Sequence, residues 1–197
     1  ERVCCKCAST SRFVDPALSI PVPKKQKSLT VQVDCGEHRG GRHSFSVIND
    51  VTVPGTSLRI HRLKCLQNNS ALWEAMLESP GVVLSASVNV VAVGCEDGTL
   101  SVFSAASGAS KWRSMVLDSC PVLLSCSGHF LLAVTEKAYL SVWDLKQNLS
   151  VLREESLRGL LSAPNSVITD ARVTESGSPV LTVSTTKTYS YDKRKQH

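Results

Sequence analysis

Two residue pairs near the start of the chain have the spacing of metal ligands. Cys4 and Cys7 are separated by two residues, as are Cys35 and His38, and 27 residues lie between the two pairs. Zinc accepts cysteine and histidine in tetrahedral sites with such spacings within each pair. The gap between the pairs is longer than in zinc fingers and contains several prolines. The sequence therefore favours free thiols and predicts no structural zinc, with these four residues as weak candidate ligands.

Patterns that carry catalysis are missing from the sequence. It contains no Gly-x-x-x-x-Gly-Lys, no Gly-x-Gly-x-x-Gly and no Gly-x-Ser-x-Gly, and its five histidines include no His-x-x-x-His pair. The carboxylates of Asp97, Asp118, Asp144 and Glu155 fall at expected turns or strand ends, where they cap and solubilise. We therefore expect no enzyme and no cofactor.

The three tryptophans are expected to have different roles. Trp143 and Trp112 lie in or next to repeated apolar runs, which favours core packing for both. Trp73 precedes those repeats. Because aromatic residues are enriched at binding hot spots, Trp73 is the candidate for an exposed partner contact.

Alternating apolar and polar residues predict strands at 28–35, 43–53 and 56–65. Residues 70–77, SALWEAML, have mixed periodicity and fit either one helical turn or a strand. From residue 80 the apolar runs come in sets. The first set lies at 81–88, 90–96, 99–105 and 110–117, the second at 121–128, 130–136, 139–145 and 150–157, and a third begins at 166.

The sets repeat one short motif. Leu100-Ser101-Val102-Phe103 matches Leu140-Ser141-Val142-Trp143 at a period of 40, and Asp144 follows the second copy. Tyr189-Ser190-Tyr191 lies 48 residues further on. A repeat of about 40 to 45 residues with four strands and a Trp-Asp pair is typical of WD-repeat propeller blades. The alternative is a β-sandwich with similarly spaced strands.

A turn signal supports the blade interpretation. Glu96-Asp97-Gly98 separates the second and third runs of the first set, and Asp-Gly supplies the positive φ angles of a two-residue hairpin turn. We predict an all-β chain of WD40-like propeller blades, preceded by a proline-containing linker. Propellers close with about 4 to 8 blades, so this one is incomplete or irregular.

The predicted organisation has four parts. They are a linker with a basic cluster (1–28), a degenerate β region (29–79), a WD-like repeat region of about two and a half blades (80–192) and a basic tail (193–197). The cluster is Lys24, Lys25 and Lys27, which fits nuclear import or a polyanion contact, although a solvated linker is the simpler interpretation.

Charge and composition exclude several classes of protein. Residues 1–64 hold 11 basic and 5 acidic residues, residues 65–186 hold 7 and 11, and residues 187–197 hold 4 and 1. The repeat region is thus acidic, so we expect weak DNA binding at most. No apolar run reaches the roughly 18 residues of a membrane helix, and the residues that follow Glu1 do not have the charged-then-apolar pattern expected of a signal segment. Cys95, Cys120 and Cys126 lie in apolar runs, which favours buried free thiols in a reducing compartment.

An extended run of the chain resembles a known family. The segment LWEAMLESPGVVLSASVNVVAVGCEDGTLSVFSA, followed by LSVWDL and EESL, is similar to the C-terminal domain of the HIRA histone chaperones and to the yeast Hir corepressors. The earlier FVDPALSIPVPKKQKSLTVQV resembles their entry segment, and the likeness spans roughly residues 13–192. The segments VCCKC and SAASGASKWRSMVLDSC depart from the family pattern.

The resemblance implies a nuclear, non-catalytic scaffold. Such proteins deposit a replacement core histone independently of replication and repress transcription. The resemblance further implies self-association as a homotrimer, binding to a calcineurin-binding-protein-like large subunit and indirect contact with core histones. The alternative is a generic WD-repeat interaction module, for instance in ubiquitin ligation or trafficking. A seven-bladed propeller upstream, in a longer sequence, would favour the histone chaperone scaffold over this module.

Overall fold

The computed structural model describes residues 20–36, 41–110, 112, 114–161, 166–184 and 188–190. These residues form four antiparallel sheets, each built from strands that follow one another in the sequence. Within this described part, no helix is long and apolar enough to cross a membrane. The all-β prediction is confirmed.

The first two sheets have four strands each. Sheet A contains β1 (Ser28–Asp34), β2 (Arg42–Thr52), β3 (Arg59–Gln67) and β4 (Ser70–Leu77). Sheet B contains β5 (Gly81–Ala86), β6 (Val90–Cys95), β7 (Thr99–Ser104) and β8 (Met115–Val116). The open alternative at 70–77 is thus settled as a strand, because β4 pairs with β3 along its length.

The other two sheets repeat this order. Sheet C contains β9 (Pro121–Ser127), β10 (Phe130–Thr135), β11 (Tyr139–Asp144) and β12 (Leu149–Ser156). Sheet D contains β13 (Ile168–Val173), β14 (Pro179–Val183) and β15 (Thr188–Ser190). The predicted runs at 121–128, 130–136 and 139–145 match three of these strands, whereas the run expected at 110–117 yields only the two residues of β8.

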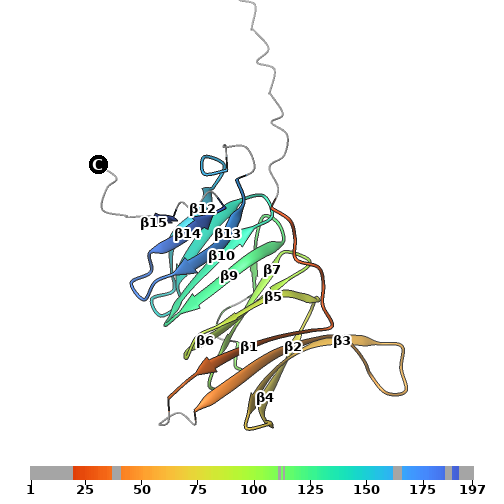
Figure 1. Ribbon diagram of the computed structural model, residues 1–197. Helices are drawn as coiled ribbons and strands as arrows, with labels where there is room; N and C mark the ends of the chain where they lie inside the picture. Colours follow the sequence, from red (N-terminus) through yellow and green to blue (C-terminus); the bar gives the residue numbers. More distant parts are fainter. Residues whose placement is uncertain are drawn as a thin grey trace, which may run out of the picture.

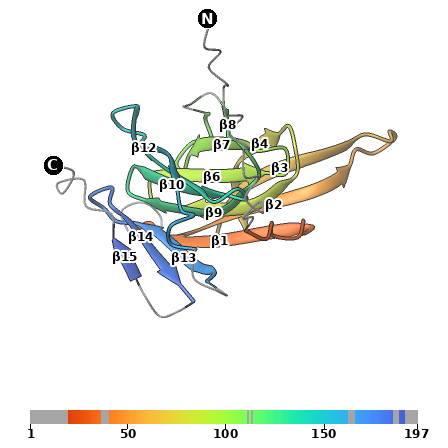
Figure 2. The same cartoon turned by 90° about the horizontal axis from the view of Figure 1, so that it is seen from above.

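The sheets stack in sequence order like the blades of an open propeller (Figure 1). The first strands of the sheets, β1, β5, β9 and β13, are packed as successive neighbours, so sheet A contacts sheet B, B contacts C, and C contacts D. Figure 2 shows the same stack from above, with sheets A and D at its opposite ends. The described residues thus form a row of blades with two end faces.

Three apolar cores join the blades. Phe45, Leu63 and Val93 belong to the core between sheets A and B, and Leu100 and Leu131 to that between B and C. A third core lies between C and D and is built from residues such as Leu132, Leu140, Ile168 and Leu181. Full burial of one such side chain stabilises a fold by about 1.5–3 kcal/mol, so the blades are held together mainly by apolar contact.

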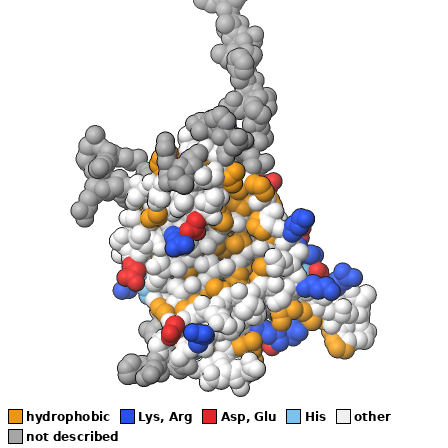
Figure 3. All heavy atoms as spheres, in the orientation of Figure 1, with side chains coloured by type: hydrophobic (Ala, Val, Ile, Leu, Met, Phe, Trp, Pro, Cys, Tyr) orange, Lys and Arg blue, Asp and Glu red, His pale blue; other side chains and the backbone are white. Residues whose placement is uncertain are grey.

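Burial patterns identify the inner and the end blades. All six residues of β6 are buried, as are five of the six in β10. A strand buried on both faces must lie between two other layers. In β1 and β14, by contrast, burial alternates from residue to residue, because sheets A and D each pack on one side only. Figure 3 shows hydrophobic side chains gathered in a band across the face of the stack in this view.

Side-chain hydrogen bonds fix the spacing between successive sheets. The Asn49 amide bridges both backbone groups of Gly81, donating to its oxygen at 2.8 Å and accepting from its nitrogen at 3.0 Å. Ser85 Oγ accepts from the Cys126 nitrogen, and Ser125 Oγ accepts from the Val173 nitrogen. Ser85 and Ser125 are 40 residues apart, so the hydrogen bonds between the sheets repeat with the same period as the strands.

Candidate functional site: a groove between sheets B and C

A groove opens where the outer strand of sheet B is too short to cover sheet C. Strand β8 has two residues and pairs only with Thr99 and Leu100 of β7, whereas β12 has eight residues. The part of sheet C that β8 leaves uncovered borders a groove of about 360 Å³. It is lined by Met115, Val116, Leu117, Asp118, Ala133, Thr135, Ser141, Trp143, Ser150, Arg153 and Glu154.

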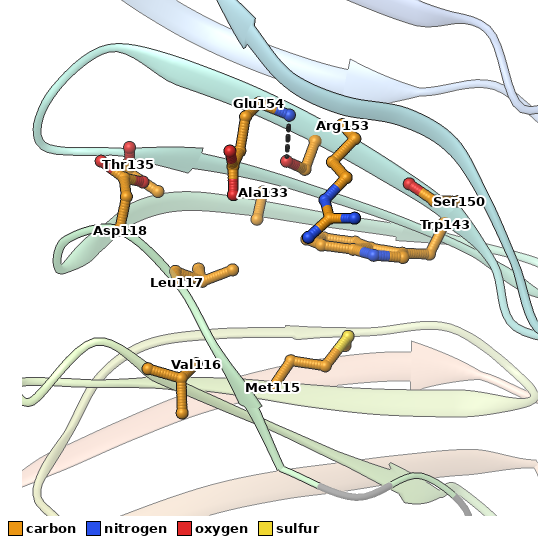
Figure 4. A pocket seen from close by; sticks show the side chains of 11 residues that line it. Met115, Val116, Leu117, Asp118, Ala133, Thr135, Trp143, Ser150, Arg153 and Glu154 are labelled. Carbon is orange, nitrogen blue, oxygen red and sulfur yellow. Dashed lines mark hydrogen bonds between the residues drawn. The ribbon is translucent and has the colours of Figure 1, made fainter.

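The groove has an apolar floor and a charged rim. Met115, Leu117 and Trp143 pack against the core between sheets B and C while also lining the groove. Figure 4 shows Arg153 and Trp143 on the same wall, formed by β11 and β12, with Val116 and Met115 on the facing wall. Val116 is 81% exposed. An apolar floor with a polar margin is the usual make-up of a protein contact surface.

A bulge in β12 directs the two charged residues of the rim. The pairing register between β11 and β12 shifts between Leu140 and Val142, so Ser141 faces both Arg153 and Glu154. Glu154 has a φ of 51°, and its nitrogen donates a 3.0 Å hydrogen bond to Ser141 Oγ. Bulges re-aim side chains. The hydroxyl of Ser141 therefore holds the geometry that places Arg153 and Glu154 at the groove.

The groove combines apolar side chains with hydroxyl and charged groups. Its lining includes hydroxyl groups but no histidine and no cysteine. Its carboxylates are those of Asp118 and Glu154, and the Ser141 hydroxyl accepts a hydrogen bond from the Glu154 backbone nitrogen. Among the described residues, no group of three or more His, Cys, Asp or Glu side chains could hold a metal ion.

Trp143 and Asp144 occupy different environments. Trp143 is half-buried in β11 and lines the groove. Asp144 Oδ1 accepts hydrogen bonds from the backbone nitrogens of Lys146 and Gln147, at 3.0 and 3.1 Å. This aspartate therefore closes the turn between β11 and β12. Phe103, which matches Trp143 in the preceding repeat, is buried in the core between sheets A and B.

The turn at Glu96-Asp97-Gly98 differs from the predicted geometry. All three residues lie between β6 and β7, and the Gly98 nitrogen donates to the Cys95 oxygen at 3.1 Å. Of the three, only Gly98 has a positive φ, at 85°. The prediction of a two-residue turn was wrong, because one additional residue allows an ordinary turn followed by a single left-handed glycine. Asp97 Oδ1 accepts from the Thr99 nitrogen and so helps to close the loop.

Trp73 is not the exposed aromatic residue that the sequence suggested. It is half-buried on the inner face of β4 and lies 5.9 Å from Phe45 between ring centroids. Its Nε1 donates to the Ala105 oxygen at 3.0 Å. Gly108 lies so close that an added Cβ would be 2.5 Å from the indole ring. The interpretation was wrong because the partners of Trp73 come from the loop after β7, more than 30 residues away.

The lysine cluster lies immediately before β1. Lys24, Lys25 and Lys27 are exposed, and Lys25 Nζ lies 3.0 Å from Asp50 Oδ2. The hydrogen bond from Lys25 lowers the pKa of Asp50. Figure 3 shows Lys and Arg side chains grouped at the margin of the molecule formed by sheet A. This pairing ties part of the cluster to the end of β2.

The zinc candidates are only partly described. Cys35 follows β1, whereas Cys4, Cys7 and His38 lie outside the described residues. The absence of structural zinc therefore stays a prediction.

The cysteines in the described part of the chain form no disulfide with one another. They are Cys35, Cys65, Cys95, Cys120 and Cys126. Burial raises the pKa of Cys65 to about 11 and those of Cys95 and Cys126 to about 12. These three thiols are neutral at physiological pH and act as small apolar side chains, as the sequence suggested for Cys95 and Cys126.

Sequence reasoning missed most of the groove. Val116, Arg153 and Glu154 carried no recognisable signal, because the groove depends on how short β8 is and on a bulge in β12. Among the lining residues, Trp143 stood out in the sequence because it ends the repeated four-residue motif. That motif predicted packing in the core rather than a place at a groove.

Comparisons with known proteins agree with the blade architecture. Residues 108–197 match the family model Hira, described as TUP1-like enhancer of split. Protein HIRA of Mus musculus is 35% identical over 176 residues, which cover 89% of this chain and 17% of the mouse protein. The chain thus spans about a sixth of the length of the curated relatives it matches.

Solved structures give the same relationship. The crystal structure of HIRA(644-1017) has a TM-score of 0.76 and 34% identity, and the match covers 90% of this chain and 54% of that one. The WD40 β-propeller domain of Doa1 has a TM-score of 0.52 at 9% identity, over 84% and 51% of the two chains, which shows the fold alone. By sequence and by structure, the chain belongs to the HIRA family, to whose C-terminal domain it corresponds.

Proposed function

We propose that this chain is a non-catalytic scaffold segment of a nuclear histone chaperone complex, serving replication-independent nucleosome assembly and transcriptional repression. The observation that carries the proposal is family membership combined with an open stack of blades whose groove offers contact chemistry. The chain self-associates, and it binds a large calcineurin-binding-protein-like subunit. Core histones are contacted indirectly through other subunits.

Charge supports a role in holding proteins rather than DNA. Residues 65–186 hold 7 basic and 11 acidic residues, and the groove rim contains Asp118 and Glu154 beside Arg153. Non-specific affinity for DNA comes mainly from Lys and Arg contacts to phosphates. The basic residues before β1 permit at most weak binding that falls steeply as salt rises.

The test is a binding titration of the whole chain at physiological salt. The chain is titrated with the large partner subunit and, separately, with duplex DNA. We expect partner binding that Val116→Glu weakens at least tenfold, because Val116 is an exposed apolar residue at the groove. Leu58→Glu is the matched control, since Leu58 is also exposed but lies before β3, away from the groove.

Two results decide the proposal. Partner binding with weak, salt-sensitive DNA binding supports the scaffold function. Tight DNA binding without partner binding contradicts it, and would mean that the family relationship reflects descent without shared function.

A further inference from the structure

A cavity separate from the groove lies where turns from sheets A, B and C meet. Its volume is about 470 Å³, and its polar lining consists of Cys35, His43, Asn89, Ser104 and His129. Sheet A provides the residue after β1 and the start of β2, sheet B the turn after β5 and the end of β7, and sheet C the turn after β9. The cavity and the groove share no lining residue.

The side chain of His43 is buried at this cavity without a hydrogen-bond partner. His43 is only 8% exposed, and in the described part of the chain neither its Nδ1 nor its Nε2 has a partner. Its ring centroid lies 6.3 Å from that of Phe45, which offers no acceptor. A buried polar group without a partner costs free energy, and such groups are rare in folded proteins. A group bound in the cavity can supply the missing hydrogen bond.

Hydrogen bonds within the protein hold the walls of the cavity in place. Ser87 Oγ donates to the Gly128 oxygen at 2.8 Å and so ties the turn after β5 to the turn after β9. The Ala105 nitrogen donates to the Asn89 oxygen at 3.1 Å, and the Ala105 oxygen accepts from Trp73 Nε1 at 3.0 Å. Because these walls are fixed by the protein itself, a ligand loses little affinity to ordering them.

The lining favours an anion of low charge. Imidazole and hydroxyl groups, such as those of His43, His129 and Ser104, can all donate hydrogen bonds. The lining contains no Asp or Glu that would repel an anion, and no Lys or Arg of the kind that binds phosphate groups. No group of three or more His, Cys, Asp or Glu among the described residues could hold a metal ion. A carboxylate accepts several hydrogen bonds at once and therefore fits this lining.

We propose that this cavity binds a carboxylate group, with His43, Ser104 and His129 as its hydrogen-bond donors. Because both ring nitrogens of His43 are buried, the ring turns on binding and presents one of them to the carboxylate. The small apolar side chains of Ala105 and Ala106 in the lining accommodate a short aliphatic part of the ligand. The carboxylate comes from a free acid or from an Asp or Glu side chain of a partner protein, and both sources present the same chemistry.

The test uses the whole chain with isobutyrate as the probe, followed by nuclear magnetic resonance of isotope-labelled histidine rings. Isobutyramide is the control ligand, since it has the same shape without the charge. We expect isobutyrate to bind at least about fivefold more tightly than isobutyramide, because hydrogen bonds to a charged acceptor are roughly twice as strong as those to a neutral one. Its binding should shift the ring nitrogen signals of His43 and His129 but not those of His61.

Two capped peptides distinguish the sources of the carboxylate. They are Ala-Glu-Ala and Ala-Gln-Ala. Tighter binding of the Glu peptide than of isobutyrate assigns the cavity to a side chain of a partner protein, and the reverse order assigns it to a free acid. In either case the Gln peptide should bind more weakly than the Glu peptide.

Variants of the chain locate the site. His43→Phe keeps an aromatic ring and removes both nitrogens, so we expect it to weaken isobutyrate binding about tenfold without lowering the unfolding temperature. Ser104→Ala removes the hydroxyl and should weaken binding about threefold. His61→Phe is the matched control, since His61 lies outside the cavity, where its Nδ1 accepts from the Asp50 nitrogen. It should leave isobutyrate binding unchanged.

The proposal is overturned if isobutyrate does not bind, or if isobutyramide binds equally well. It is also overturned if both His43→Phe and Ser104→Ala leave binding unchanged, or if the signals of His61 shift as much as those of His43. Circular dichroism checks that each variant is folded.

Discussion

Glycines on the inner strands allow the sheets to approach closely. At Gly94 of β6, an added Cβ would lie 2.5 Å from Pro121 Cγ and 2.6 Å from Val83 Cγ1. Neither contact involves a flexible chain end, because proline is a ring and valine is branched at Cβ. The residue type at this position is therefore determined by packing between sheets B and C rather than by backbone conformation.

A glycine-to-alanine pair tests this packing. We expect Gly94→Ala to lower the free energy of unfolding by about 1–3 kcal/mol, the usual cost of overpacking. Gly159→Ala is the control, since no atom lies within 4 Å of the position that its new Cβ would take, and it should change stability by less than about 0.5 kcal/mol. Urea denaturation measures both; equal effects would show that close packing is not what requires glycine at position 94.

The buried thiols make stability depend on alkaline pH. The pKa of Cys126 is raised from 9.0 to about 12 by burial, so the folded chain keeps a proton that the unfolded chain loses. The protonated thiol therefore leaves the free energy of unfolding at its full value below about pH 9. This free energy falls as the pH rises from 9 towards 12, because only the unfolded chain loses the proton there. We expect each such thiol to lower the free energy of unfolding by about 1 kcal/mol per pH unit in this range.

Replacing one thiol isolates the effect. Cys126→Ala should start from a lower stability at pH 7, because it leaves a small cavity, but its stability should decline less steeply above pH 9. Urea midpoints measured from neutral to alkaline pH give the slopes. An unchanged slope relative to the original chain would rule out ionisation of Cys126 as a cause.

Among the strands, β12 stores backbone strain in its bulge. Glu154 has a φ of 51°, a conformation that costs a residue with a side chain about 1–2 kcal/mol. Glycine adopts it without this cost. The hydrogen bond from the Glu154 nitrogen to Ser141 Oγ helps to hold this conformation.

We therefore expect Glu154→Gly to raise the free energy of unfolding by about 0.5–1 kcal/mol, while weakening partner binding at the groove. Glu155→Gly, one residue further along β12 and without a positive φ, should lower stability by about 0.5–1 kcal/mol, as glycine does in strands. Thermal denaturation of the two variants provides the comparison. Destabilisation by Glu154→Gly would show that the Glu154 side chain, rather than its backbone, matters to the fold.

Elements with a strict local pattern could be predicted from the sequence. Alternation identified β1, β2 and β3, and the 40-residue repeat identified the matching strands of sheets B and C. The surroundings of Trp73 could not be predicted, because Ala105 and Gly108 reach it from another blade. The groove could not be predicted either, since it results from the early end of β8 and from the bulge in β12. Neither feature produces a periodic pattern of apolar residues in the sequence.

In the molecule as a whole, the two end faces differ from the three buried interfaces. Sheet A carries the row of Ser46, Lys64 and Glu74 on its outer face, and Arg172 forms an ion pair with Asp170 in sheet D. The inner sheets B and C have central strands, β6 and β10, that are almost entirely buried. Contacts with other chains are therefore expected at strand edges and at the groove.

If the chain functions through self-association, the purified chain should form oligomers when no other subunit is present. The measurement is sedimentation equilibrium across micromolar concentrations, with circular dichroism to confirm the β fold. We predict a homotrimer, the state that the sequence resemblance implies and one that has closed symmetry. A folded chain that remains monomeric at every concentration would contradict a function based on self-association.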